Sequence, residues 1–131
     1  MKSLQSYIEK EQTKIFDKYG AFFAFSQEQL NHHKEPDVEY TNIGSGLVAP
    51  RDNAIKIGEE LDATYKKGIQ ERIEEYGIDK IIQYELSNYE CQISMDYTDA
   101  FETLKDYGVT QEQMDEQFSL FMEYCRENDL F

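Results

Sequence analysis

Residues 21–50 read AFFAFSQEQLNHHKEPDVEYTNIGSGLVAP, and this stretch decides the fold class. The apolar run at 21–25 has the length of a short buried strand. Residues 38–48 place Gly44-Ser45-Gly46 between two apolar segments, which predicts a β-hairpin with a glycine turn. Pro50 then ends the second strand of the hairpin, because proline cannot donate a ladder hydrogen bond. The stretch therefore predicts a small antiparallel sheet.

A short helix is expected between the first strand and the hairpin. Ser26 followed by Gln29 fits a capping box, which predicts a helix from Gln27 to about His32. His32 and His33 form the one histidine pair of the chain. Adjacent side chains on a helix point about 100° apart, so one metal ion rarely binds both rings. We interpret the pair as part of a polar surface loop and predict no metal site.

Helical periodicity dominates the rest of the chain. The longest helical pattern ends at Tyr76 and carries an i+4 apolar row from Ile57 to Ile73, with Gly68 as a candidate break. Residues 91–95 alternate apolar and polar side chains, which predicts a third strand. The segments with helical spacing are 3–18, 51–76, 79–89, 98–107 and 111–128.

We therefore expect an α+β fold with four to five helices packed around a two- to three-stranded antiparallel sheet. The strands are expected at about 21–25, 38–48 and 91–95. A length of 131 residues fits one domain, 1–131, with one modest core.

The charge of the chain is concentrated in its C-terminal part. The net charge is −14, and residues 84–131 hold twelve acids against two bases. Such a charge repels nucleic acid and anionic lipid, so we expect neither as a direct partner and predict a basic protein surface instead. Residues 1–10 lack the apolar core of a signal peptide, and no apolar stretch reaches the ~20 residues of a spanning helix. We expect a cytoplasmic protein with no membrane partner.

The last helical segment separates its apolar and acidic side chains. Its apolar stripe holds Met114, Phe118, Phe121, Met122 and Cys125. Its opposite face carries carboxylates at helical spacing, about 6 Å apart along the axis for each i+4 step, with Ser119 in the gap. These carboxylates belong to Glu112, Glu116, Glu123 and Glu127.

Tyrosines are interleaved with the acids of this C-terminal part. Aromatic rings with polar tips are common anchors at protein interfaces, and carboxylates beside them complement Arg and Lys of a partner. Three interpretations stay open: a solvated face, a docking surface for a basic protein, and a mimic of nucleic acid that occupies a nuclease channel. The candidate partner-binding residues are Glu112, Glu116, Glu123, Glu127, Asp115, Glu102, Asp99, Tyr97, Tyr107 and Tyr124.

No catalytic pattern competes with this surface. Asp96-x-Thr98 lacks the glycine and the final glutamate of a calcium loop, and Gly44-Ser45-Gly46 lacks the rest of a nucleotide-binding fingerprint. Cys91 and Cys125 are far apart in sequence, and we interpret them as buried packing residues. We predict no enzyme activity, no catalytic residue and no cofactor.

Two segments resemble a group of small acidic proteins from phages and mobile elements of gut bacteria. They are Phe22-Phe23-Ala24-Phe25-Ser26-x-x-Gln29 and Tyr84-Glu85-Leu86-Ser87-Asn88-Tyr89-Glu90, with the glycine-containing hairpin between them. Small acidic proteins of mobile elements often inhibit host defence nucleases, as anti-CRISPR and anti-restriction proteins do. The resemblance implies such a genomic context, and with it the cytoplasm of a bacterial host cell, and assigns no catalytic residue.

The function we expect is a non-enzymatic inhibitor or adaptor that binds a basic protein surface, such as the nucleic-acid channel of a defence nuclease. The alternative is a self-associating structural or regulatory protein of a phage or mobile element. In that alternative, the tyrosines and the apolar row from Ile57 to Ile73 would form a homodimer seam.

Overall fold

The computed structural model describes residues 1–131, which divide into two compact units. We name Ser3–Gly68 the sheet unit. The helical unit joins Met1–Lys2 to Ile69–Phe131. The division falls inside one long helix, whose residues up to Gly68 belong to the sheet unit. That the whole chain is one folding domain stays a prediction.

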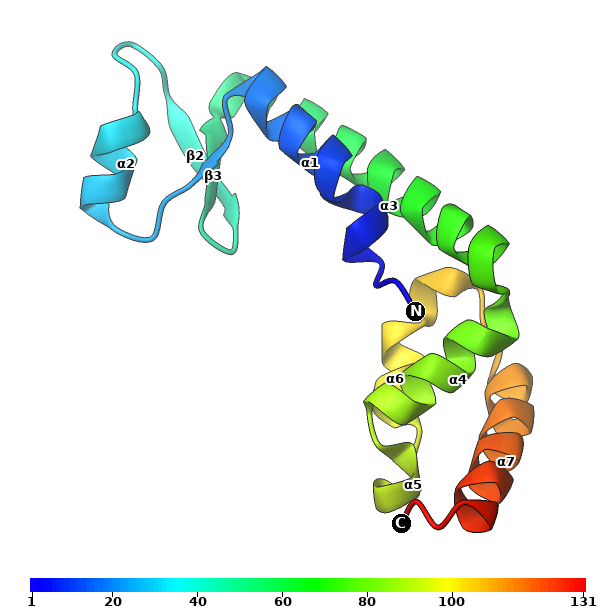
Figure 1. Cartoon of the computed structure of the whole chain (residues 1–131). Coiled ribbons are helices and arrows are strands. Elements are labelled where there is room, and N and C mark those ends of the chain that lie inside the picture. The colour runs from blue at the N-terminus through cyan, green and yellow to red at the C-terminus, as the bar shows by residue number, and fades with distance from the viewer. The chain divides into compact units, whose positions relative to one another are not determined.

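The sheet unit alternates helices and short strands (Figure 1). The hairpin expected from the glycine turn and the strand expected from the apolar run are both present. The elements are α1 (Gln5–Tyr19), β1 (Phe22–Phe23), α2 (Gln27–His33), β2 (Tyr40–Gly44), β3 (Leu47–Pro50), the 3₁₀ turn η1 (Arg51–Asn53) and the first part of α3 (Ala54–Tyr76).

The three strands form an antiparallel sheet in the order β1-β3-β2. Phe22 and Asn42 both pair with Val48, so β3 is the central strand. In the hairpin turn, Ser45 and Gly46 have φ of 53° and 83°, a left-handed conformation that glycine adopts at little cost. The hairpin predicted for residues 38–48 is confirmed, and β1 pairs with its second strand.

One face of this sheet packs on α1 and α3. The core between the sheet and these two helices contains Ile15 of α1, Ala49 of β3 and Ile57 of α3, with Leu61 packed against it. Gly68 lets α1 and α3 approach closely, because a Cβ there would lie 2.6 Å from Cγ2 of Ile8. The candidate break at Gly68 is absent, since α3 continues through this residue to Tyr76.

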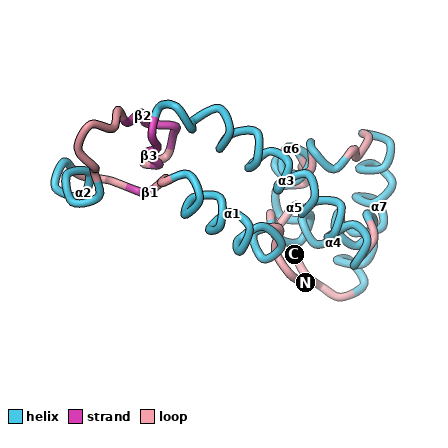
Figure 2. The backbone as a smooth tube through the Cα atoms, turned by 90° about the horizontal axis from the view of Figure 1, so that it is seen from above, coloured by secondary structure: helices cyan, strands magenta, loops and turns pink.

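The helical unit contains helices and connecting loops, and no strand (Figure 2). Helix α4 packs against α5, α6 and α7. The interior of the helical unit contains several fully buried side chains, among them Ile81, Ile82, Leu86, Leu104 and Met114. The elements are the end of α3, α4 (Ile78–Asn88), α5 (Cys91–Ser94), α6 (Thr98–Thr103), the 3₁₀ turn η2 (Lys105–Tyr107) and α7 (Gln111–Glu127).

The strand predicted at 91–95 is wrong, since this segment forms the one-turn helix α5. Of its apolar residues only Cys91 is buried, whereas Ile93 and Met95 are exposed. The alternation therefore did not mark a strand with one buried face. The main chain instead closes a helical turn between Glu90 and Met95, both of which have positive φ.

The fold is α+β, with more helices than expected. Seven α-helices are present, including the short α2 and α5. The expectation that all helices surround the sheet is also wrong, because α4 to α7 belong to a unit without strands. None of the helices combines the length and apolar character needed to cross a lipid bilayer.

A buried ion pair lies inside the helical unit. Arg72 and Glu85 are both almost fully buried, and Nη2 of Arg72 lies 3.8 Å from Oε1 of Glu85. Arg72 also donates to the hydroxyl of Tyr107 at 2.9 Å and to the carbonyl of Lys2 at 3.2 Å. These bonds distribute the buried positive charge over several acceptors and hold α3, α4 and η2 together.

Candidate functional site

The predicted acidic row lies on the exposed face of α7. Thr110 and Gln113 complete a capping box that begins the helix, as predicted. Met114, Phe121 and Cys125 are buried on the opposite side, which turns the acidic face outward. Glu112, Glu116, Glu123 and Glu127 are all exposed, and none of them forms a salt bridge. The negative charge of the row is therefore not neutralised within the chain.

The three other predicted acids are partly engaged. Asp99 and Glu102 lie exposed on α6, and Glu102 is 3.4 Å from Nζ of Lys105. Asp115 accepts a hydrogen bond of 2.5 Å from the hydroxyl of Tyr97. The ring of Tyr97 packs edge-on against Phe118 of α7, with ring centroids 5.4 Å apart. Tyr97 therefore ties the start of α6 to α7.

The hydrogen bond to Asp115 raises the pKa of the Tyr97 phenol above its ordinary value. A neighbouring carboxylate stabilises the protonated phenol and opposes a second negative charge. Partial burial acts in the same direction with a smaller effect. Tyr97 is thus a neutral donor on an acidic surface.

Tyr107 was predicted to bind a partner, whereas the structure places it in the interior of the helical unit. Its side chain is buried, and its hydroxyl accepts the hydrogen bond from Arg72. Its role in the structure is therefore to hold the buried Arg72. Sequence spacing alone placed it beside acids without showing which way the ring points.

Tyr124 is 58 % exposed and lies beside a shallow hollow of about 450 Å³. The hollow belongs to the helical unit, and its apolar walls come from α4, α7 and the C-terminal tail. Nε2 of Gln92 donates to the carbonyl of Leu130 at 3.1 Å, which holds the tail against α5. Among the lining residues are Tyr84, Phe121, Tyr124 and Leu130. The sequence showed Tyr124 but gave no sign of the hollow.

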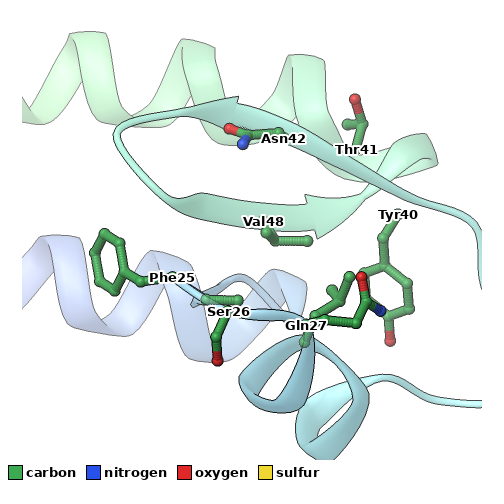
Figure 3. Close-up of a pocket in the computed structure, with 9 residues that line it drawn as sticks. Phe25, Ser26, Gln27, Tyr40, Thr41, Asn42 and Val48 are labelled. Carbon is green, nitrogen blue, oxygen red and sulfur yellow. The ribbon is translucent and has the colours of Figure 1, made fainter.

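A second feature was missed altogether and lies in the sheet unit. The face of the sheet that includes Phe22 and Val48 is covered by α2, a helix with no buried residue. A cavity of about 350 Å³ remains under this helix. In Figure 3, Val48 lies between Phe25 and Tyr40, which stand at opposite ends of the view. The walls of this cavity also include the polar residues Ser26, Gln27 and Asn42.

A larger cavity of about 590 Å³ adjoins the first one at Tyr40, which lines both. Phe22, His33 and Tyr40 contribute three rings to its wall. The ring centroid of Phe22 is 5.0 Å from that of His33 and 5.6 Å from that of Tyr40. Asp17 and Glu35 add two carboxylates. The sequence did contain a signal for these cavities, because the segment Phe22–Ser26 and one member of the histidine pair, His33, contribute to their walls.

The predicted packing role of the cysteines agrees with their surroundings. Both thiols are free and buried, and burial raises the pKa of Cys91 and of Cys125. Asp96 and Asp99 add a smaller effect at Cys91. A raised pKa keeps a thiol protonated and weakly nucleophilic at neutral pH.

His32 and His33 end α2 and do not lie in a loop, although both are exposed as expected. Asp96 accepts hydrogen bonds from the main-chain NH and the hydroxyl of Thr98. These bonds lower the pKa of Asp96 and support the start of α6. The Asp96-x-Thr98 pattern is thus explained by local structure.

Comparison with known proteins identifies a family. A family model described as a family of unknown function, DUF7659, covers residues 4–126. No curated protein and no solved structure matches the chain.

Proposed function

The chain belongs to the DUF7659 family of unknown function, and we propose that it is a non-enzymatic inhibitor or adaptor that binds a basic protein surface. The proposed surface is the acidic row of α7, namely Glu112, Glu116, Glu123 and Glu127, together with Tyr124. The observation that carries the proposal is that these four exposed carboxylates have no salt-bridge partner in the chain.

The arrangement of the row favours a partner that normally binds a polyanion. The row extends over fifteen residue steps, about 22 Å along the helix axis. Arginines and lysines that line a nucleic-acid channel could pair with successive turns of α7, since they are already spaced to neutralise regular negative charge. The concrete form of the proposal is an inhibitor of a defence nuclease, of the anti-CRISPR or anti-restriction type.

The hollow beside Tyr124 adds an apolar anchor to this charged surface. Binding energy in protein interfaces concentrates in a few buried side chains, with charged groups around them setting orientation and association rate. Leu120, Tyr124 and Leu130 are each at least 44 % exposed. A partner that places an apolar side chain in the hollow and basic groups along α7 would use both features.

The experiment is affinity capture from the natural host with three matched proteins. The parent is compared with the charge-reversal variant Glu112→Lys/Glu116→Lys/Glu123→Lys. The control variant Glu9→Lys/Glu59→Lys/Glu74→Lys changes the net charge equally at exposed positions outside α7. We expect a basic protein to be captured by the parent and the control and to be lost by the α7 variant.

Two further measurements sharpen this test. Binding should weaken steeply with salt, because the contact is charge-dominated. It should also be reduced by added nucleic acid if the partner is a nuclease. The proposal fails if the α7 variant binds as strongly as the parent while far-UV circular dichroism shows both to be folded.

Self-association is the second candidate, supported by exposed apolar side chains of the helical unit. Ile93, Met95, Leu130 and Phe131 are each more than 40 % exposed, and the Gln92–Leu130 bond keeps the tail beside α5. The seam expected for this candidate includes Ile57 and Ile69, which are buried within the chain. Light scattering of the parent and of Ile93→Ser/Phe131→Ser tests this candidate, which predicts a dimer that the variant disrupts.

A further inference from the structure

The two faces of the sheet are covered very differently. Ala49 of β3 packs with Ile15 of α1 and Ile57 of α3 on one face. Val48 points to the other face, because successive residues of a strand alternate. Its paired neighbours Phe22 and Asn42 share this second face. The seven-residue α2 lies over this face, and the two adjoining cavities of about 350 and 590 Å³ remain open beneath and beside that helix.

The larger cavity combines aromatic rings with negative charge. Along the wall, the ring centroid of Phe22 lies 5.0 Å from that of His33 and 5.6 Å from that of Tyr40. Glu35 is held beside them, since its main-chain NH donates to the hydroxyl of Tyr40 at 3.0 Å. Asp17 contributes a second carboxylate from the last turn of α1. Neither carboxylate forms a salt bridge in the chain.

No positive side chain of the protein lines this cavity. Arg51 lies next to the lining residue Pro50, but its Nη1 is 3.3 Å from a carboxylate oxygen of Glu39. An anion would therefore meet two carboxylates and no counter-charge. The residues also do not group into a set that could hold a metal ion. A ligand that carries positive charge on an apolar body fits both the rings and the acids.

We propose that this cavity binds an alkylammonium group. The charged nitrogen would lie between Asp17 and Glu35, and its alkyl carbons would contact Phe22 and Tyr40. Aromatic faces and carboxylates both attract such a cation, and the aliphatic chain is favoured by the apolar wall. The site is in the sheet unit and is independent of the α7 surface.

The adjoining smaller cavity extends the site with uncharged polar groups. Ser26, Gln27 and Asn42 line it, and Tyr40 connects it to the larger one. Each of these side chains already makes one hydrogen bond within the chain, to Gln29, Asn31 or Gly44. Their remaining oxygen lone pairs can accept from a second amine of a polyamine or from the main chain of a lysine-bearing peptide. The shared chemistry is an alkylammonium group on a chain long enough to reach from one cavity into the next.

The first experiment is a titration of the full chain followed by two-dimensional NMR. The probes are spermidine, N-acetyl-lysine methylamide and the uncharged analogue N-acetyl-norleucine methylamide. We expect saturable shifts at Phe22, His33 and Tyr40 with at least one of the amines and none with the uncharged analogue. Saturation by spermidine alone identifies a free polyamine as the source, and saturation by the lysine derivative identifies a peptide side chain.

The second experiment removes the charge without changing the shape. We expect Asp17→Asn/Glu35→Gln to weaken amine binding at least tenfold. The control Glu9→Gln/Glu28→Gln removes the same charge from exposed helix positions outside the lining and should bind like the parent. The proposal is overturned if neither amine saturates, if the uncharged analogue binds equally well, or if the Asp17/Glu35 variant keeps the parent's affinity.

Discussion

Two glycines of α3 show how tertiary contacts decide the role of a residue. Gly58 has no atom within 4 Å of the position where a Cβ would stand. Gly68 has Cγ2 of Ile8 at 2.6 Å and Cδ1 of Leu4 at 3.4 Å from that position. Gly58 thus lowers the helix propensity of α3 without any packing role, whereas Gly68 is required for the close packing of α1 against α3.

Gly58→Ala and Gly68→Ala should therefore change stability in opposite directions. We expect Gly58→Ala to stabilise the protein by about 1 kcal/mol through helix propensity. Gly68→Ala should cost about 1–2 kcal/mol net, since overpacking exceeds that gain. Urea unfolding followed by circular dichroism measures both, and a stabilised Gly68→Ala variant would contradict the close approach of α1 and α3.

Tyr97 provides a second prediction for a single residue. Its phenol pKa is raised by Asp115, so the phenol stays protonated above the ordinary value of about 10. The bond stabilises the fold below about pH 10, and this contribution is lost as the pH rises through the folded-state pKa. We expect Asp115→Ala to lower the Tyr97 pKa, measured from the tyrosine Cζ chemical shift. Glu112→Ala should leave that titration unchanged.

At the scale of elements, α7 depends on its first turn. The hydroxyl of Thr110 accepts from the NH of Gln113, and the side chain of Gln113 accepts from the NH of Thr110. Thr110→Ala should destabilise the protein by about 1 kcal/mol. Hydrogen exchange should show that the loss begins in residues 111–114. Equal exchange rates in parent and variant would mean that the cap does not limit the start of α7.

The attachment of α4 to the end of α3 depends on the Arg72–Glu85 pair. Removing one member of a buried pair leaves the other charge uncompensated, which costs about 3–5 kcal/mol. We expect Arg72→Met to cost more than Glu85→Gln, because Arg72 also donates to Tyr107 and Lys2. A double-mutant cycle in urea should show a coupling above about 1 kcal/mol. Additive effects would show that the 3.8 Å contact contributes little.

For the whole molecule, the question is whether two compact units unfold together. Helix α3 begins in the sheet unit and ends in the helical unit, and its last eight residues are too few for a stable isolated helix. We expect one cooperative transition, with the NMR methyl signals of Val48 and Leu86 lost at the same urea concentration. Two separate midpoints would show that 1–131 is not one folding domain.

Local signals in the sequence were sufficient where a single element explains them. The glycine turn predicted the hairpin, Thr110 and Gln113 predicted the start of α7, and the apolar stripe predicted its buried side. The acidic row followed from the same stripe, because one face of an amphipathic helix determines the other. These features need only spacing along the chain.

Predictions failed where the outcome depends on a neighbour. The alternation at 91–95 needed a partner strand, and the helical unit contains none. The sequence spacing placed Tyr107 beside the surface acids, whereas in the structure its hydroxyl lies in the interior and accepts a hydrogen bond from Arg72. The cavities beside Tyr40 arise because α2 covers one face of the sheet incompletely, which no spacing rule describes.

The sequence by itself determined the α+β class, the hairpin, the amphipathic α7 and the concentration of negative charge. Each depends on residue type, on periodicity or on composition, which are properties of the chain before it folds. Only the tertiary structure decided which tyrosines are exposed, why Gly68 is needed, and where rings from α2, β1 and β2 meet two carboxylates. Those properties depend on distances between residues far apart in sequence, and such distances exist only after the core has packed.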